Sequence, residues 1–181
     1  MIGIKKLKKR NNVIVVAKNS NNIWWAIGSA FLVISGVIIV RKLTSKESKG
    51  NIDLSKFDSP DIPGSGRCMD QEFIKMLQKL AKITKLPIFE MINSGARSPY
   101  WNKKVGGVSN SSHKMPTCKA ADIKAPTTTI RNKIVVAAKL VGFKRIGVGR
   151  TFVHLDNDTS KKQYVAWGYP SGTKPPINPF V

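Results

Sequence analysis

Acidic residues, histidines and cysteines are all scarce in this chain of 181 residues. Only 10 Asp and Glu stand against 31 Lys and Arg, which gives a net charge of +21. Residues 51–181 alone hold 21 of the basic and 9 of the acidic residues. Such a surface attracts polyanions, whether nucleic acid, anionic lipid or the acidic polymers of a bacterial envelope. No recognition helix, zinc finger or RNA-binding aromatic motif accompanies the charge, so a membrane-tethered nucleic-acid binder would rest on charge alone.

The two cysteines, Cys68 and Cys118, are too few for a disulfide framework or a thiolate metal site. Export from the cytoplasm would permit one bridge between them but would not require it. The sequence therefore leaves open whether they pair or are unrelated thiols.

One long uncharged run, Ile23 to Val40, is present near the N-terminus. Its 18 residues are near the shortest length that spans a bilayer as a helix. Trp24 and Trp25 lie at one end and Arg41-Lys42 follow the other, as interfacial anchors do. No small-residue cleavage site follows the run, which favours an uncleaved anchor over a signal peptide. The bias of basic residues places the N-terminus in the cytoplasm and the rest of a single-pass protein outside it.

Composition divides the chain into five predicted segments. They are a basic N-terminal segment (1–22), a transmembrane helix (23–40), a polar linker (41–67), a folded domain (68–170) and an irregular tail (171–181).

The folded domain is predicted to be α+β. Apolar periodicity and capping residues predict helices over 69–85, from Ser98-Pro99 to Gly106-Gly107, and from Thr127 or Thr128 to Val141. Strands are expected at 87–93, 120–124, 144–148, 152–155 and 163–167. The expected architecture is a small antiparallel sheet with flanking helices.

The only two histidines, His113 and His154, both lie near carboxylates in the sequence. His113 precedes Ala120-Ala121-Asp122-Ile123, and His154 lies in a strand-like segment that ends at Asp156. Two imidazoles and one carboxylate leave a fourth tetrahedral position for water, which is typical of a catalytic rather than a structural zinc site. This pattern indicates hydrolysis.

An ordered series of short motifs resembles a known family. The motifs are Ser94-Gly95-Ala96-Arg97-Ser98-Pro99, Asn102, Val105-Gly106-Gly107-Val108, Asn110-Ser111-Ser112-His113, Ala120-Ala121-Asp122-Ile123, Gly147-Val148-Gly149, Phe152-Val153-His154-Leu155-Asp156 and Trp167-Gly168-Tyr169. Together, over residues 69–169, they resemble the M15 family of zinc peptidases, which includes D-alanyl-D-alanine carboxypeptidases and phage L-alanyl-D-glutamate endolysins.

The resemblance implies roles for particular residues. His113, Asp122 and His154 would ligate Zn²⁺, and the sheet and helices would surround that site. Arg97 would bind a carboxylate or carbonyl of the substrate peptide, since a guanidinium can meet a carboxylate with two hydrogen bonds. A carboxylate beside the second histidine would act as general base.

Two features depart from the family pattern. Eight residues separate His113 from Asp122 where six are usual, an expansion that a loop tolerates at small entropic cost. Thr151 occupies the position, three residues before His154, where members often carry the basic carboxylate. Asp156 is the nearest replacement, and it is equally compatible with acting as the base and with orienting a ligand.

The sequence thus predicts a membrane-anchored zinc peptidase with an extracytoplasmic domain. Its expected substrates are peptidoglycan stem or cross-bridge peptides, cut by carboxypeptidase or endopeptidase action in cell-wall lysis or remodelling. The alternative is a catalytically impaired, zinc-containing module that binds the cell wall. No pattern in the sequence indicates an oligomeric state.

Overall fold

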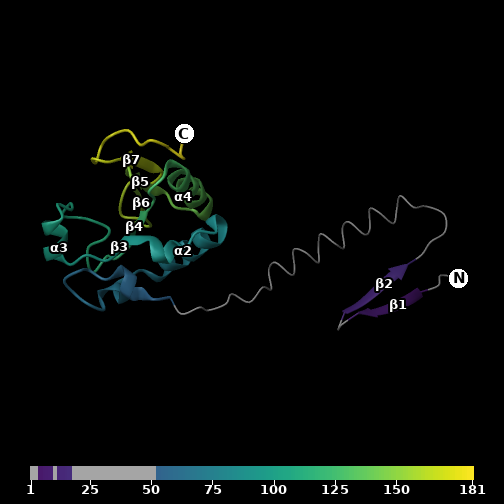
Figure 1. The fold of residues 1–181 in the computed structure, drawn as a ribbon. Coiled ribbons are helices and arrows are strands. Elements are labelled where there is room, and N and C mark those ends of the chain that lie inside the picture. The colour runs from purple at the N-terminus through teal and green to yellow at the C-terminus, as the bar shows by residue number, and fades with distance from the viewer. Residues whose placement is uncertain (1–3, 10–11, 18–51) are drawn as a thin grey trace. The chain divides into compact units, whose positions relative to one another are not determined.

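The structure, a computed structural model, describes residues 4–9, 12–17 and 52–181 (Figure 1). It comprises two compact units, Met1–Gly50 and Asn51–Val181. In the first, β1 (Ile4–Lys9) and β2 (Asn12–Ala17) form an antiparallel hairpin. The predicted transmembrane helix at 23–40 lies outside the described residues. Within the described ranges, every helix is too short or too polar to cross a membrane.

The second unit is α+β, as predicted. Its helices are α2 (Gln71–Thr84), α3 (Pro99–Lys104) and α4 (Thr128–Val141), with 3-10 helices η1 (Leu54–Phe57), η2 (Ser65–Cys68) and η3 (Ile88–Met91). Its strands are β3 (Ile92–Ser94), β4 (Ala120–Lys124), β5 (Arg145–Val148), β6 (Phe152–Asp156) and β7 (Val165–Gly168). They form one five-stranded sheet in the order β3-β4-β6-β5-β7.

The sheet is mixed, so the prediction of an antiparallel sheet is wrong for one pair of strands. Three neighbouring pairs are antiparallel, but β5 and β7 run parallel. The chain reverses after β6 and passes to the far side of β5. A strand that follows such a reversal is antiparallel to β6 and therefore parallel to β5. Strands β3 and β4 form one side of the sheet, and β5 and β7 form the other.

The two faces of the sheet have different chemistry, because side chains alternate along a strand. Ile123, Val153 and Leu155 are fully buried in the hydrophobic core. On this side α4 packs against β5 and β6, and α2 lies beside α4 (Figure 1). Asp122 and His154 alternate with these apolar residues and therefore lie on the opposite, polar face.

Local capping residues fix both long helices. The Asp70 side chain accepts a hydrogen bond from the Phe73 backbone N–H at 2.8 Å and begins α2. Thr127 caps α4 in the same way, as predicted. Gly142 ends α4 with φ of +108°, a conformation that glycine adopts without steric cost.

The folded unit begins earlier than the predicted boundary at residue 68. The second unit starts at Asn51, and Phe57, in the expected linker, is fully buried in the hydrophobic core. The polar residues around Phe57 suggested a tether, but its aromatic ring provides enough apolar surface to hold the segment on the domain. The expected tail, 171–181, contains neither helix nor strand.

The strand predicted at 87–93 is displaced towards the C-terminus. Residues 88–91 form η3, and the strand occupies only 92–94. The Pro87 carbonyl accepts hydrogen bonds from the backbone N–H groups of Glu90 and Met91. Those bonds close a helical turn, which apolar content alone does not reveal.

Cys68 and Cys118 form a disulfide, which decides the alternative that the sequence left open. The bridge links the end of η2 to the loop between His113 and Asp122. Beside it, the Asp70 backbone N–H donates to the Cys118 carbonyl at 3.0 Å. The expanded loop between two candidate ligands is therefore attached covalently to the start of α2.

Candidate metal centre

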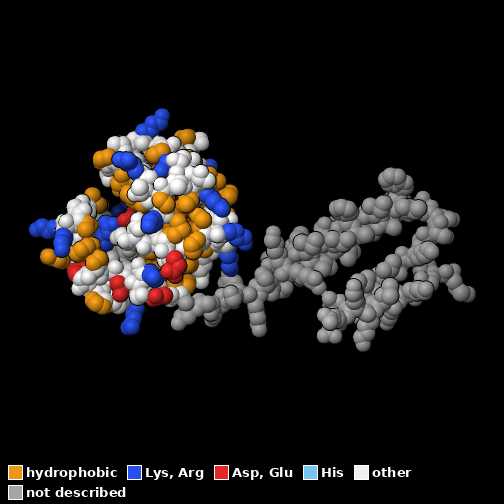
Figure 2. All heavy atoms as spheres, in the orientation of Figure 1, with side chains coloured by type: hydrophobic (Ala, Val, Ile, Leu, Met, Phe, Trp, Pro, Cys, Tyr) orange, Lys and Arg blue, Asp and Glu red, His pale blue; other side chains and the backbone are white. Residues whose placement is uncertain are grey.

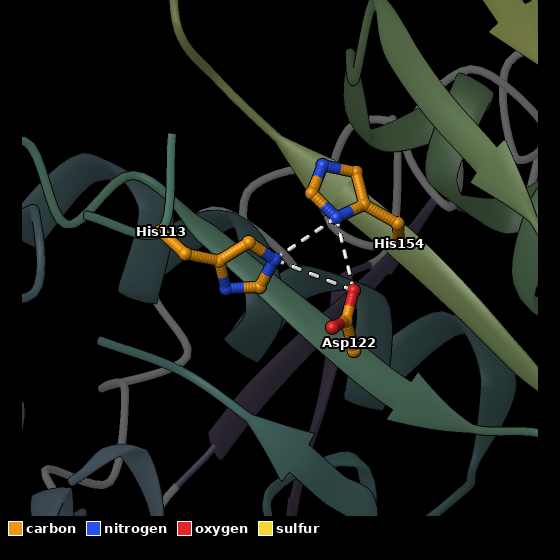
Figure 3. A group of neighbouring side chains, drawn as sticks. All are labelled: His113, Asp122 and His154. Atoms are coloured by element: carbon orange, nitrogen blue, oxygen red, sulfur yellow. Dashed lines mark hydrogen bonds and ion pairs between the residues drawn. The ribbon is translucent and has the colours of Figure 1, made fainter. Parts of the chain in front are cut away.

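Three side chains far apart in sequence converge on the polar face of the sheet (Figure 3). Asp122 lies in β4 directly opposite His154 in β6, so the strand register brings these two together. His113 comes from the loop after α3. Its backbone carbonyl accepts from the Arg97 N–H at 2.9 Å, and the Met115 N–H donates to the Arg97 carbonyl at 2.9 Å. These bonds hold the loop against the segment that follows β3.

The spacing of the three inward atoms suits a small dication. Nε2 of His113 lies 3.1 Å from Nδ1 of His154, which lies 2.9 Å from Oδ1 of Asp122. The remaining separation, from Nε2 of His113 to Oδ1 of Asp122, is 3.4 Å. Ligand atoms bound tetrahedrally to zinc lie about 3.3 Å apart, given bonds of about 2.0–2.1 Å. The triangle therefore has the dimensions of one face of a zinc tetrahedron.

The outer nitrogens of both rings are bound to acceptors, which fixes the tautomers. Nδ1–H of His113 donates to the Gly95 carbonyl at 2.7 Å. Nε2–H of His154 donates to Oδ2 of Asp156 at 3.1 Å. In the neutral form each ring then directs its lone pair inward, as metal-binding histidines do. Two lone pairs and a carboxylate oxygen at these distances repel one another unless a cation or a proton lies among them.

Burial and charge act in opposite directions on the pKa values of the three groups. Burial lowers the pKa of His113. It acts in the same direction on His154, but hydrogen bonds to Asp122 and Asp156 outweigh it and raise the pKa of His154 to about 9. Burial opposes ionisation of Asp122, but the two histidines hold its pKa well below its usual range. A metal ion would compete with a proton for Nδ1 of His154.

Arg97, predicted to contact the substrate, lies in the site but binds a candidate ligand. One guanidinium nitrogen donates to Oδ2 of Asp122 at 2.7 Å, and Nε donates to Ser94 at 2.9 Å. Arg97 thus holds the Asp122 oxygen that faces away from the two histidines. A substrate group could reach only the remaining guanidinium hydrogens.

Asp156, predicted as general base or orienting group, is 1% exposed and makes three hydrogen bonds. Besides the bond from His154, it accepts from Arg145 Nε at 2.8 Å and from the Asp158 backbone N–H at 3.1 Å. Thr151, the position of the basic carboxylate in many members, has an exposed side chain in the turn before β6.

Arg145 is a site residue that the sequence reasoning missed. It lies opposite Asp156 in the register of β5 and β6, and its guanidinium lies 5.3 Å from the centre of the Trp167 ring. The available signal was a charged residue next to Ile146, Gly147 and Val148 in the strand predicted at 144–148. Its partner could not be named without the register of β5 against β6.

A second buried carboxylate supports the loop that carries His113. Asp158 is 4% exposed and accepts a hydrogen bond from the Ser112 hydroxyl at 3.0 Å. The adjacent Asn157 side chain donates to Asp70, the cap of α2, at 2.9 Å. The segment after β6 therefore joins the loop that carries His113 to the start of α2.

The three converging residues lie in a cleft of about 580 Å³. Trp167 and Tyr169 form part of its wall, with the Trp167 ring 5.4 Å from that of His154. Gly147 makes this wall possible, because a Cβ there would lie 2.8 Å from Trp167 and 2.9 Å from Tyr169. Burial, together with the charge of Asp122, raises the pKa of Tyr169 to about 12, so its phenol stays protonated.

The three converging side chains define a candidate metal centre within a cleft. The family model for peptidase M15 matches residues 44–156, more than half of the chain. The chain belongs to the peptidase M15 family. All three converging residues and Asp156 lie within the matched range. No match was found among curated proteins or among solved structures.

Proposed function

We propose that this protein is a zinc-dependent peptidase that hydrolyses stem or cross-bridge peptides of peptidoglycan. Membership of the peptidase M15 family supports the peptidase activity. The observation that carries the choice of metal is the triangle of His113, Asp122 and His154, whose donor types and spacing suit zinc. A zinc ion held there would polarise the scissile carbonyl and lower the pKa of a bound water towards 7.

In this proposal Arg97 has two roles: it holds the Asp122 carboxylate and it binds the substrate. Its bond to Oδ2 of Asp122 fixes the direction of the other carboxylate oxygen. Its remaining hydrogens can donate to a carbonyl or carboxylate of the peptide, because a guanidinium offers five N–H donors.

Asp156 serves as a positioning residue for His154. Its three hydrogen bonds and near-complete burial favour orientation of the ring over proton transfer to and from the substrate. Tyr169 adds a neutral phenol to the cleft, which can donate a hydrogen bond to a carbonyl oxygen of the substrate.

The proposed substrate and location rest on charge and on the sequence resemblance. The second unit retains a large excess of basic residues, which favours association with an anionic cell wall. The apolar run at 23–40 would anchor the chain in the membrane with the cleft on the external side, where peptidoglycan lies. The protein's partners would then be wall peptides and the bilayer rather than nucleic acid.

A digestion of defined muropeptides tests the proposal. We expect cleavage that EDTA abolishes and that added Zn²⁺ restores, with the cut bond identified by the intact masses of the products. His154→Ala should remove activity, whereas Lys139→Ala, an exposed change on α4, should not. Metal-independent cleavage, or full activity in His154→Ala, would refute a zinc peptidase.

The second candidate is a zinc-containing module that binds the wall without cutting it. The specific observation in its favour is Thr151, which replaces the usual basic carboxylate and whose side chain is exposed. Wild-type protein that binds wall fragments in a zinc-dependent manner, and never releases cleaved products, would support this candidate.

A further inference from the structure

The outer surface of α2 and α4 carries an apolar patch that the proposed reaction does not use. Ile83, Val136 and Leu140 are 49%, 51% and 72% exposed, although each has an aliphatic side chain. They line one shallow groove together with Thr84, Asn132, Lys133 and Ala137. The patch is therefore contiguous across the two helices rather than scattered.

Exposed lysines surround this patch, and Figure 2 shows Lys and Arg side chains along this side of the second unit. Lys133 and Lys139 flank the ridge of Val136 and Leu140, since at 3.6 residues per turn they lie about 60° to either side of Val136. Lys79 lies one turn before Ile83, and Lys85 follows the end of α2. Within the described part of the chain, none of these four lysines pairs with a carboxylate. The α4 sequence contains no acidic residue.

We propose that this lysine-ringed patch docks the catalytic unit onto an anionic lipid surface. Aliphatic side chains ringed by lysines are the composition of interfacial membrane-binding surfaces, because long lysine side chains reach the headgroups while the apolar ones enter the acyl boundary. The charge complementarity favours anionic lipid over a second copy of this cationic chain.

The length of chain before the folded unit also favours this occupant. Ten residues, 41–50, separate the end of the uncharged run from the second unit. Fully extended, they span at most about 35 Å. If the run is a membrane anchor, as proposed above, the start of the second unit stays within that distance of the bilayer, which raises the effective concentration of the patch at the lipid surface.

Docking by this face would orient the cleft. The helices pack on the apolar face of the sheet, whereas His154 and Asp122 lie on the other face, and Figure 1 shows α3 across the sheet from α2 and α4. With α2 and α4 on the bilayer, the cleft opens away from the lipid and towards the wall. The inference rests on the proposed membrane attachment and not on zinc chemistry.

The test uses full-length protein in nanodiscs, with methyl NMR of labelled Ile, Leu and Val. Because the anchor would hold every variant on the disc, the readout is contact and not co-sedimentation. Paramagnetic headgroup lipids should attenuate the methyl signals of Ile83, Val136 and Leu140 in discs that contain phosphatidylglycerol, but much less in discs of phosphatidylcholine alone. The exposed methyls of Val105 and Val108, on the cleft side, should keep their intensity.

Charge reversal provides the matched comparison. K133E/K139E should lower the ratio of docked to undocked protein roughly 25-fold or more, since each lysine near an anionic surface contributes on the order of a fivefold factor. K103E/K104E, the same change in charge on α3, should leave the ratio unchanged.

Three results would overturn the proposal. They are protein that does not associate with the discs, equal attenuation of the methyl signals of Val105 and Val108, and attenuation that does not depend on lipid charge. Signals that respond to a second copy in the disc but not to the paramagnetic lipid would also overturn it. Muropeptide cleavage is measured separately, so failure of docking and failure of the peptidase proposal remain distinguishable.

Discussion

Asp156→Asn separates two roles for a carboxylate that touches a candidate metal ligand. The substitution keeps the shape of the side chain but removes its charge. Oδ2 of Asp156 lies 3.1 Å from Nε2 of His154 and Oδ1 lies 2.8 Å from Arg145. An asparagine can still accept one hydrogen bond, but it orients the imidazole and raises its basicity less than a carboxylate does.

The magnitude follows from these contacts. Loss of a hydrogen-bonded carboxylate behind a metal-binding histidine typically weakens metal affinity about 10–100-fold, or roughly 1.4–2.7 kcal/mol. The Arg145 side chain is only 12% exposed, so it also loses a buried ionic partner. Complete loss of such a partner costs about 3–5 kcal/mol, and the retained amide oxygen should keep the destabilisation below that.

The assay is a zinc titration of hydrolysis together with urea unfolding. We expect Asp156→Asn to shift the zinc requirement by the factor above and to recover turnover within about tenfold of wild type at saturating zinc. Asp158→Asn is the matched control, because Asp158 is also buried but contacts no imidazole, and an amide oxygen there can still accept the hydrogen bond from the Ser112 hydroxyl that supports the His113 loop. Its zinc requirement should change little.

One result would refute the positioning role. If Asp156→Asn binds zinc like wild type but loses about 10²–10⁴-fold in turnover at saturating zinc, Asp156 is the general base.

Three further predictions address the disulfide, the cleft wall and pH. Replacing Cys68 and Cys118 by serine opens a loop with a sequence separation of 50 and should lower the free energy of unfolding by about 4 kcal/mol. For a unit of this size the Tm should fall by roughly 15 °C, and a fall of less than about 3 °C in thermal melts followed by circular dichroism would contradict the prediction. Gly147→Ala should push Trp167 into the cleft and lower kcat/KM about 10–100-fold, while the zinc content stays at the wild-type level. Unchanged kinetics would show that this wall of the cleft does not contact the substrate. The pKa of His154 is raised from 6.5 to about 9, so the stability that this residue contributes in chelator-treated protein is present below pH 6.5 and is lost as pH rises through 9. The Tm should therefore fall over this pH range, and added zinc should suppress the fall. A Tm that does not fall would contradict the raised pKa of His154.

Most local elements and the candidate ligands could be predicted from the pattern of residues alone. The strand at 120–124 has the predicted bounds, and the helix capped by Thr127 ends at Gly142 as expected. These features depend on capping and periodicity over a few neighbouring residues. His113, Asp122 and His154 could be chosen because histidine is so scarce and because their order resembles the peptidase M15 family, which the family model supports.

The contacts among the groups around those ligands emerged only with the three-dimensional arrangement of the chain. The pairing of Arg145 with Asp156, the bond from Arg97 to Asp122 and the parallel β7 all depend on how distant segments are placed side by side. The disulfide likewise joins residues 50 positions apart. Periodicity specifies which face of a strand a residue occupies, but it does not specify the register between strands, and register selects each partner.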